Sequence, residues 1–225
     1  DRSIQIKEQT DEPAFGTRDF EGMQLAVSKR EREKIMGKIF VLIGKSASGK
    51  DTIYQRLIES EELNLNKIVP YTTRPRREGE VCGESYVFCD EAEVDRLERE
   101  GRIVELREYN TVFGIWKYFT VDNGDIDYKN KDYILIGTLD TYEKIRKYFG
   151  KDVVLPIYIE VEDGERLKRA ISREESQSQP KYEEMCRRFL ADAKDFSEEK
   201  LKKCNVLQRF ENRNLEETIE KIKAY

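Results

Sequence analysis

The stretch that decides the fold is Gly44-Lys45-Ser46-Ala47-Ser48-Gly49-Lys50-Asp51-Thr52. An apolar run over 39–43 precedes it, and a helical pattern over 53–58 follows it. A phosphate-binding loop requires this order of strand, glycine loop and helix, because backbone N–H groups and the helix N-terminus then face one anion. Lys50 can reach the terminal phosphates of a nucleotide. The stretch is therefore predicted to bind nucleotide phosphates; the alternative is a glycine-rich turn without a ligand.

The loop departs from its usual ending at Asp51. A serine or threonine normally stands there, and its hydroxyl binds Mg²⁺. A carboxylate is a harder ligand, and its charge beside phosphates is tolerable only with a cation between them. Asp51 is therefore predicted to be a metal ligand. The alternative is that it only begins the next helix, where an acidic side chain is favoured anyway.

The composition limits the chemistry. The chain has 225 residues, enough for one sizeable core, and a net charge of −5 without a broad basic field, which argues against nucleic acid as a partner. It has no histidine, so Ser-His triads and metalloprotease motifs are excluded. Phosphoryl transfer fits what remains, because it depends on positioning and on the electrostatic stabilisation of phosphate oxygens.

The cysteines indicate a reducing compartment. They form no C-x-x-C pair and read as free thiols, so a cytoplasmic location is expected. No stretch is apolar enough to cross a membrane, and the first thirty residues hold no signal-peptide core, so no membrane partner is expected.

Residues 1–36 differ from the rest and are predicted to be an N-terminal extension, with Met36 near the ancestral start. Their polar composition favours a solvated, flexible tail, while residues 19–34 could form a helix that docks on an unknown protein partner.

From residue 38 onward, strand and helix patterns alternate. Apolar runs occur at 39–43, 67–71, 86–89, 102–109, 133–137, 153–161 and 205–210. Helical patterns occur near 52–60, 90–100, 138–149, 163–173, 180–195 and 214–223. Several runs are apolar on consecutive positions, which indicates strands buried on both faces. The predicted fold is α/β, a doubly wound parallel sheet with a P-loop and with helices on both faces.

Residues 71–128 break this alternation with short β-runs and the turn sequence Asn123-Gly124. They are predicted to be a small β-rich insertion that binds the second substrate. The core then comprises 37–70, 129–162 and 196–225, and residues 163–195 form a helical lid.

The insertion begins with a cluster of arginines, Arg74, Arg76 and Arg77, near Pro75 and Gly79, which restrict the backbone. Arginine forks bind phosphate bidentately, so the cluster predicts a phosphate site. The alternative is a basic loop that pairs with its own acidic neighbours, which are Glu78, Glu80 and Glu84.

This segment resembles the acceptor signature of guanylate kinases. The matching residues are Thr72-Thr73-Arg74, Arg77, Gly79-Glu80-Val81, Gly83, Tyr86 and Phe88. The resemblance covers about 38–225 and is strongest at 39–57 and 71–88. It implies a guanylate kinase-like domain over 37–225 that transfers the γ-phosphate of ATP, with Mg²⁺, to a nucleoside monophosphate, GMP foremost. The implied ATP site is the loop 44–52, and the implied acceptor-binding residues are Thr73, Arg74, Arg77, Tyr86, Glu105 and Phe113.

The resemblance implies that Glu105 reads guanine, whose N1–H and N2–H₂ groups one carboxylate can accept together. The chain departs from the family around this base. Pro70 stands near an expected serine, Phe113 replaces a tyrosine, and Ile115 replaces a small hydroxyl residue. An acidic residue expected on the strand near Ile136 is also missing, and Asp51 is hypothesised to take over its part in magnesium binding. The resemblance thus implies a monophosphate acceptor more firmly than GMP itself.

The predicted lid carries the remaining catalytic candidates. Arg169 and Arg173 lie four residues apart on one helix face, and Arg188 resembles a third lid arginine. With Lys50, the resemblance implies that they stabilise the transferring phosphoryl group. The alternative is surface pairing with nearby glutamates. Asn212 resembles a residue that contacts the donor adenine.

Two other functions stay open. One is a P-loop kinase for a different small phosphorylated or nucleotide acceptor, which the departures around the base favour. The other is a guanylate kinase-like module that binds a phosphorylated partner. The intact Gly49-Lys50 pair counts against the module.

Overall fold

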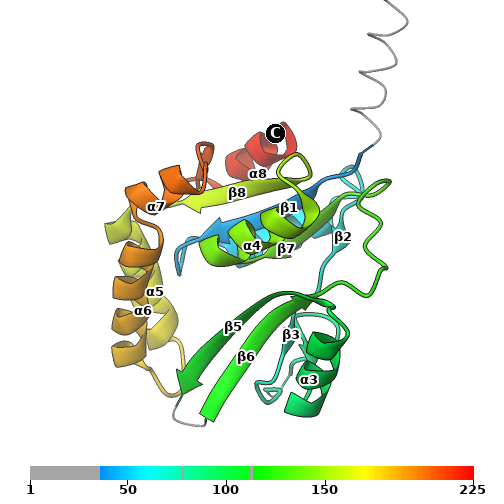
Figure 1. Cartoon of the computed structure of the whole chain (residues 1–225). Coiled ribbons are helices and arrows are strands. Elements are labelled where there is room, and N and C mark those ends of the chain that lie inside the picture. The colour runs from blue at the N-terminus through cyan, green and yellow to red at the C-terminus, as the bar shows by residue number, and fades with distance from the viewer. Residues whose placement is uncertain (1–35, 78, 112–113) are drawn as a thin grey trace, which may run out of the picture. The chain divides into compact units, whose positions relative to one another are not determined.

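The central sheet is built around the apolar run that precedes the glycine loop. The computed structural model describes residues 36–77, 79–111 and 114–225, and in it that run forms β1 (Ile39–Gly44) in the middle of five strands (Figure 1). The order is β2-β7-β1-β8-β9, and all neighbours are parallel. The other strands are β2 (Asn66–Lys67), β7 (Tyr133–Ile136), β8 (Val154–Glu160) and β9 (Arg209–Glu211). The predicted buried parallel sheet is confirmed.

Helices cover both faces of this sheet because β1 buries its side chains on both sides. Val41 and Ile43 pack in one apolar cluster with α4 (Leu139–Phe149) and α7 (Glu198–Lys203). Leu42 packs in another with α2 (Lys50–Ile58) and α8 (Leu215–Lys223). Each such buried aliphatic side chain contributes about 1.5–3 kcal/mol. This double layer fixes the end of β1 from which the glycine loop begins.

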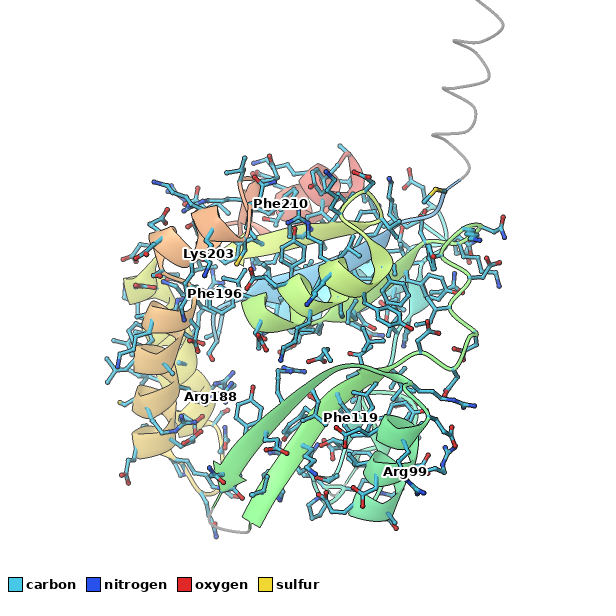
Figure 2. The ribbon with its side chains drawn as sticks, in the orientation of Figure 1. Arg99, Phe119, Arg188, Phe196, Lys203 and Phe210 are labelled. Carbon is cyan, nitrogen blue, oxygen red and sulfur yellow. The ribbon has the colours of Figure 1, made fainter. Side chains whose placement is uncertain are left out.

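A second sheet has the order β4-β3-β6-β5. Its strands are β3 (Tyr71–Thr72), β4 (Val87–Phe88), β5 (Ile103–Thr111) and β6 (Gly114–Val121). One face packs on α3 (Glu91–Arg99), where Phe119 of β6, labelled in Figure 2, is fully buried against Val94 and Leu97. The opposite face of the β5–β6 pair carries polar and aromatic side chains.

Three details differ from the sequence-based prediction. The run 67–71 is not one strand: it divides around Pro70, which lacks an N–H group, into β2 of the central sheet and β3 of the second. The run 205–210 yields only β9, and α7 was not predicted; Ser197 begins it by accepting the N–H of Lys200. The predicted runs also lacked β6, an eight-residue strand that pairs with both β3 and β5.

A pair of helices, α5 (Asp163–Glu175) and α6 (Tyr182–Asp195), packs side by side at the edge of the molecule where β8 ends (Figure 1). The side chain of Glu162 begins α5 by accepting the N–H groups of Gly164 and Glu165. The predicted lid over 163–195 coincides with this helix pair.

The predicted N-terminal extension and its helix over 19–34 fall almost entirely on residues 1–35, which lie outside the described residues. No helix in the described part of the chain has the length and apolarity needed to span a membrane.

Candidate active site

The glycine loop turns sharply between β1 and α2. Gly49 has a φ of 85° and Ala47 a φ of 60°, which is a left-handed conformation that side chains other than glycine rarely adopt. A Cβ atom added to Gly44 would lie 2.8 Å from the carbonyl oxygen of Ile159, so no side chain fits there. The backbone is thus held in the curled form that a phosphate cradle needs.

Asn212 packs against the glycine loop and supports it. Its side-chain amide donates to the carbonyl oxygen of Ser48 at 2.9 Å, and Asn212 is buried. A Cβ atom on Gly49 would lie 2.5 Å from the same amide nitrogen. The structure therefore gives Asn212 a role in holding the loop, while its contact with the donor adenine stays a prediction.

Replacing Gly49 by alanine is expected to displace the loop, because the new methyl group meets Asn212 and the left-handed backbone becomes strained at a cost of about 1–3 kcal/mol. The KM for ATP should rise at least about tenfold, since 1.4 kcal/mol is a factor of ten in binding. Gly150→Ala is the matched control: Gly150 also has positive φ, but a Cβ there meets nothing within 4 Å. Equal effects of both changes on ATP binding would contradict the expected clash.

Lys50 and Asp51 begin α2, where Asp51 is exposed. Neither side chain forms an ion pair with another described residue, so both are available to a ligand. The described residues contain no group of three or more His, Cys, Asp or Glu side chains that could hold a metal. A single carboxylate fits Mg²⁺ bound mainly through nucleotide phosphates and water, which is how this ion is usually held.

Arg74 is the buried anchor of the second sheet. Its guanidinium donates to both carboxylate oxygens of Glu80, at 2.7 and 3.1 Å, and lies over the rings of Tyr86 and Phe88. The hydrogen bonds from Arg74 and from the N–H of Arg77 lower the pKa of Glu80. The alternative that the arginines pair with acidic neighbours therefore holds for Arg74. Its ion pair with Glu80 fixes the Arg74 side chain in place.

The other predicted phosphate ligands are placed differently. The side chain of Arg77 is exposed and pairs with no described carboxylate, so it can move onto a ligand. Thr73 accepts the N–H of Lys117 through its hydroxyl and thereby ties the segment after β3 to β6. Phe113 lies outside the described residues.

Tyr86 stands just before β4, and its ring packs edge-on against that of Tyr118 on β6, with 5.6 Å between the ring centroids. Burial is the main cause that raises the pKa of its phenol; Tyr118 and the charge of Asp51 add to this, while Arg107 and Arg74 oppose it.

Glu105 lies on the face of β5 that points away from α3, but its carboxylate is not open. It accepts the hydroxyl of Thr120 and the guanidinium of Arg107, and the Glu105 side chain is fully covered. Glu105 is therefore a buried, paired carboxylate and not an exposed strand residue, and its recognition of guanine stays a prediction.

Two of the three predicted lid arginines lie beside the loop. Arg188, labelled in Figure 2, donates to the hydroxyl of Ser46 at 3.3 Å. Arg173 and Arg188 line a small pocket together with Ser46. Arg169 instead donates to Glu165 and to the carbonyl oxygen of Asn212. The structure thus brings Arg173 and Arg188 to the loop and directs Arg169 toward the end of β9.

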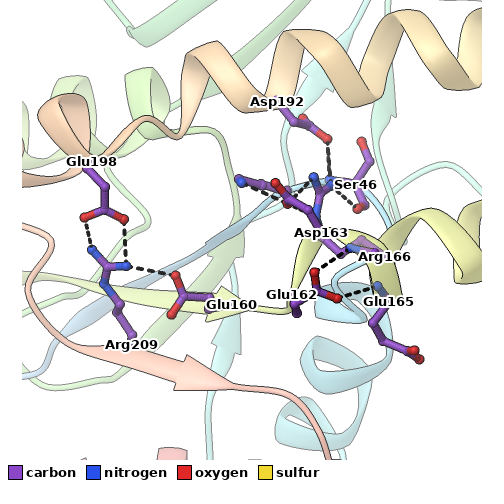
Figure 3. Close-up of polar contacts among 11 residues, drawn as sticks. Ser46, Glu160, Glu162, Asp163, Glu165, Arg166, Asp192, Glu198 and Arg209 are labelled. Atoms are coloured by element: carbon purple, nitrogen blue, oxygen red, sulfur yellow. Dashed lines mark hydrogen bonds and ion pairs between the residues drawn. The ribbon is translucent and has the colours of Figure 1, made fainter.

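Sequence reasoning missed a network that joins the lid to the loop (Figure 3). The guanidinium of Arg166, which is 1% exposed, donates to the carbonyl oxygen of Ser46 at 2.9 Å and to Asp163 at 2.8 Å. Asp192 of α6 accepts the N–H of Ser46 at 2.7 Å. Lys45 also pairs with Asp163. Arg166 stands seven residues before Arg173 on α5, and that spacing was the available signal.

Comparisons with known proteins agree with this geometry. A family model described as guanylate kinase matches residues 36–225. A guanylate kinase of Caldanaerobacter subterraneus subsp. tengcongensis is 29% identical over 85% of this chain and 87% of its own length. One of Anaplasma phagocytophilum is 38% identical over 41% of this chain, and the match spans only 44% of that protein.

A solved structure shares the fold. The crystal structure of guanylate kinase from Anaplasma phagocytophilum matches with a TM-score of 0.58 over 84% of both chains, at 24% identity. The family match over residues 36–225 carries the assignment, and the chain belongs to the guanylate kinase family.

Proposed function

We propose that this chain transfers the γ-phosphoryl group of ATP to GMP and forms GDP. Family membership supports the reaction. The observation that carries the proposal is the glycine loop: positive φ at Gly49 and Ala47 curls its backbone, Lys50 begins α2 without an ion pair to another described residue, and Arg188 donates to the hydroxyl of Ser46. Nucleotide phosphates bound to the loop would therefore lie beside the cations that phosphoryl transfer requires.

The residues divide the work by charge. Lys50 and the loop N–H groups hold the donor phosphates. Arg77 and Tyr86 hold the acceptor phosphate, and Arg74 joins them only where its guanidinium leaves Glu80. Arg173 and Arg188 neutralise the charge that spreads over the transferring group; Arg169 is the third predicted lid arginine. No general base is required, because the acceptor phosphate is largely ionised at neutral pH. This agrees with the absence of histidine from the sequence.

Mg²⁺ accompanies ATP in this proposal, and Asp51 is the residue that would hold it. When bound, the ion supplies positive charge that neutralises the phosphate oxygens. The chain's own part is to present one exposed carboxylate beside Lys50 at the start of α2.

Replacing Asp51 by serine is expected to raise the Mg²⁺ concentration for half-maximal rate by about tenfold, since a neutral hydroxyl is the weaker ligand. Rates across a Mg²⁺ titration at fixed ATP measure this. Asp140→Ser is the matched control, because Asp140 also stands in the first turn of a helix and loses the same favourable helix-end charge. If the Mg²⁺ titration of Asp51→Ser matched that of the wild type, Asp51 would not be a metal ligand, and its role would be confined to the start of α2.

The test of the function is ADP formation from MgATP with GMP, dGMP, AMP, UMP and CMP in turn. Turnover on GMP above all others supports the proposal. A preference for another monophosphate would instead establish a kinase with a different acceptor, a second candidate favoured by the Arg107 guanidinium on Glu105. ATP binding without turnover on any of them would favour a module that binds a phosphorylated partner.

A further inference from the structure

The carboxylate of Glu105 is occupied in a way that guanine recognition has to undo. Its side chain has no exposed surface, and it accepts Arg107 Nε at 3.1 Å, Arg107 Nη2 at 3.4 Å and Thr120 Oγ1 at 3.0 Å. A carboxylate offers about four lone pairs, so its capacity is nearly filled. A base can reach these oxygens only when one of the covering side chains moves.

Arg107 is the covering side chain that can move. It stands two residues after Glu105 on β5, so both side chains lie on the same face of the sheet. Thr120 lies opposite Glu105 on β6 and is itself buried, whereas the Arg107 side chain retains 18% of its exposure.

A displaced guanidinium needs new acceptors, because a charge separated from its buried partner is costly. Guanine provides them. While Glu105 accepts N1–H and N2–H₂, the adjoining edge of the same base presents O6 and N7, and arginine binds these two atoms bidentately. Adenine would place an amino donor against the guanidinium. Pro70 and Ile115, at the positions where the family resemblance implies hydroxyl residues, have no side-chain donor for O6.

We propose that Arg107 determines base specificity: it pairs with Glu105 and turns onto O6 and N7 of guanine when GMP binds. This rests on the proposed function. Guanine then replaces each residue as the partner of the other: Glu105 accepts N1–H and N2–H₂, and Arg107 donates to O6 and N7. Neither Glu105 nor Arg107 is left without a hydrogen-bond partner. The site reads guanine from two edges with two residues of one strand.

The test compares GMP with 7-deaza-GMP, which lacks only the N7 acceptor, in the wild type and in Arg107→Met. In the wild type, KM should be about five- to tenfold higher for the analogue than for GMP. The effect is partial because the analogue loses only one of the two acceptors that Arg107 binds. Arg107→Met should raise the KM for GMP at least about tenfold and reduce the analogue-to-GMP ratio to about one, with kcat within a few fold. Calorimetric titration with each nucleotide checks that KM follows binding.

Two further variants separate recognition from folding. Arg107→Lys keeps a positive charge beside Glu105 but loses the planar fork, so it should also lose the response to N7. Arg96→Met is the matched control, since Arg96 pairs with Glu93 and Glu100 on α3, away from the site; it should behave like the wild type. Thermal unfolding of each variant shows that it is folded.

Three results would overturn the proposal. A lower KM for GMP in Arg107→Met would mean that Arg107 only competes with the base for Glu105. An analogue-to-GMP ratio equal in wild type and variant would mean that Arg107 does not contact N7. If the wild type neither binds nor phosphorylates GMP, the proposed function fails together with this inference, whereas normal GMP turnover with an unchanged ratio removes the inference alone.

Discussion

Lys50→Ala is expected to reduce kcat for phosphoryl transfer from MgATP to GMP by about 10²–10³-fold, the usual effect of removing one group that stabilises developing charge. Lys50 is the first residue of α2 and pairs with no described carboxylate, so its ammonium group has the nucleotide phosphates as its partner. The stability should change little, because no described ion pair is broken. Single-turnover rates with saturating ATP separate this loss from weaker ATP binding.

The control for Lys50 is Lys38→Ala. Lys38 precedes β1 at the end far from the loop, and its ammonium group donates to the carbonyl oxygen of Asp152. That variant should keep the wild-type kcat. A loss below tenfold in Lys50→Ala, with ATP still bound, would mean that Lys50 does not stabilise the transferred group.

Arg166→Ala is expected to lower the free energy of unfolding by about 3 kcal/mol. This is the lower end of the loss expected when a buried ion pair is broken, because Arg166 is buried but its partner Asp163 is half exposed. The change removes the donor to the Ser46 carbonyl oxygen and leaves Asp192 beside the loop without its cation. It also removes the guanidinium that packs over Phe189. Denaturant unfolding measures the loss, and the KM for ATP should rise with it.

The matched control is Arg187→Ala. Arg187 pairs with Glu184 at the same three-residue spacing as Arg166 and Asp163, but both partners are exposed. Exposed pairs contribute about 0–1 kcal/mol, so this variant should be nearly as stable as the wild type. Similar losses in both variants would show that Arg166 is an ordinary surface arginine of the lid.

The parts of the fold that local patterns determine were predicted. The consecutive apolar residues of β1, β7 and β8 can be buried only in a covered parallel sheet, and the glycine loop can only follow such a strand. The division of the run 67–71 around Pro70 was missed, because nothing local says that the chain changes sheets there. The helix α7 was missed because its six residues are mostly charged and leave one buried leucine.

The sequence indicated which residues belong to the candidate site but not which of them pair with one another. Arg74 was found because it stands in an arginine cluster, but its bond to Glu80 depends on how the segment 74–80 closes. Arg107 was missed although strand alternation places it beside Glu105. The contacts of Arg166 and Asp192 with Ser46 join residues more than a hundred positions apart. The spacing of Arg166 and Arg173 places both on one face of α5 but does not reveal which residues they contact.

Ser46 is bound by both helices of the predicted lid. Arg166 of α5 donates to its carbonyl oxygen, Arg188 of α6 donates to its hydroxyl, and Asp192 of α6 accepts its N–H group. Donor loop and lid are therefore coupled mechanically, and a swing of α5 and α6 would pull the phosphate cradle along with it. The second sheet carries no such tether to the loop among the described contacts; it meets the core at α4, where Lys144 donates to the carbonyl oxygen of Leu106, and through the connections 68–70 and 122–132. A displacement of the second sheet would therefore break contacts with α4 but leave the bonds between Ser46 and the helices α5 and α6 intact.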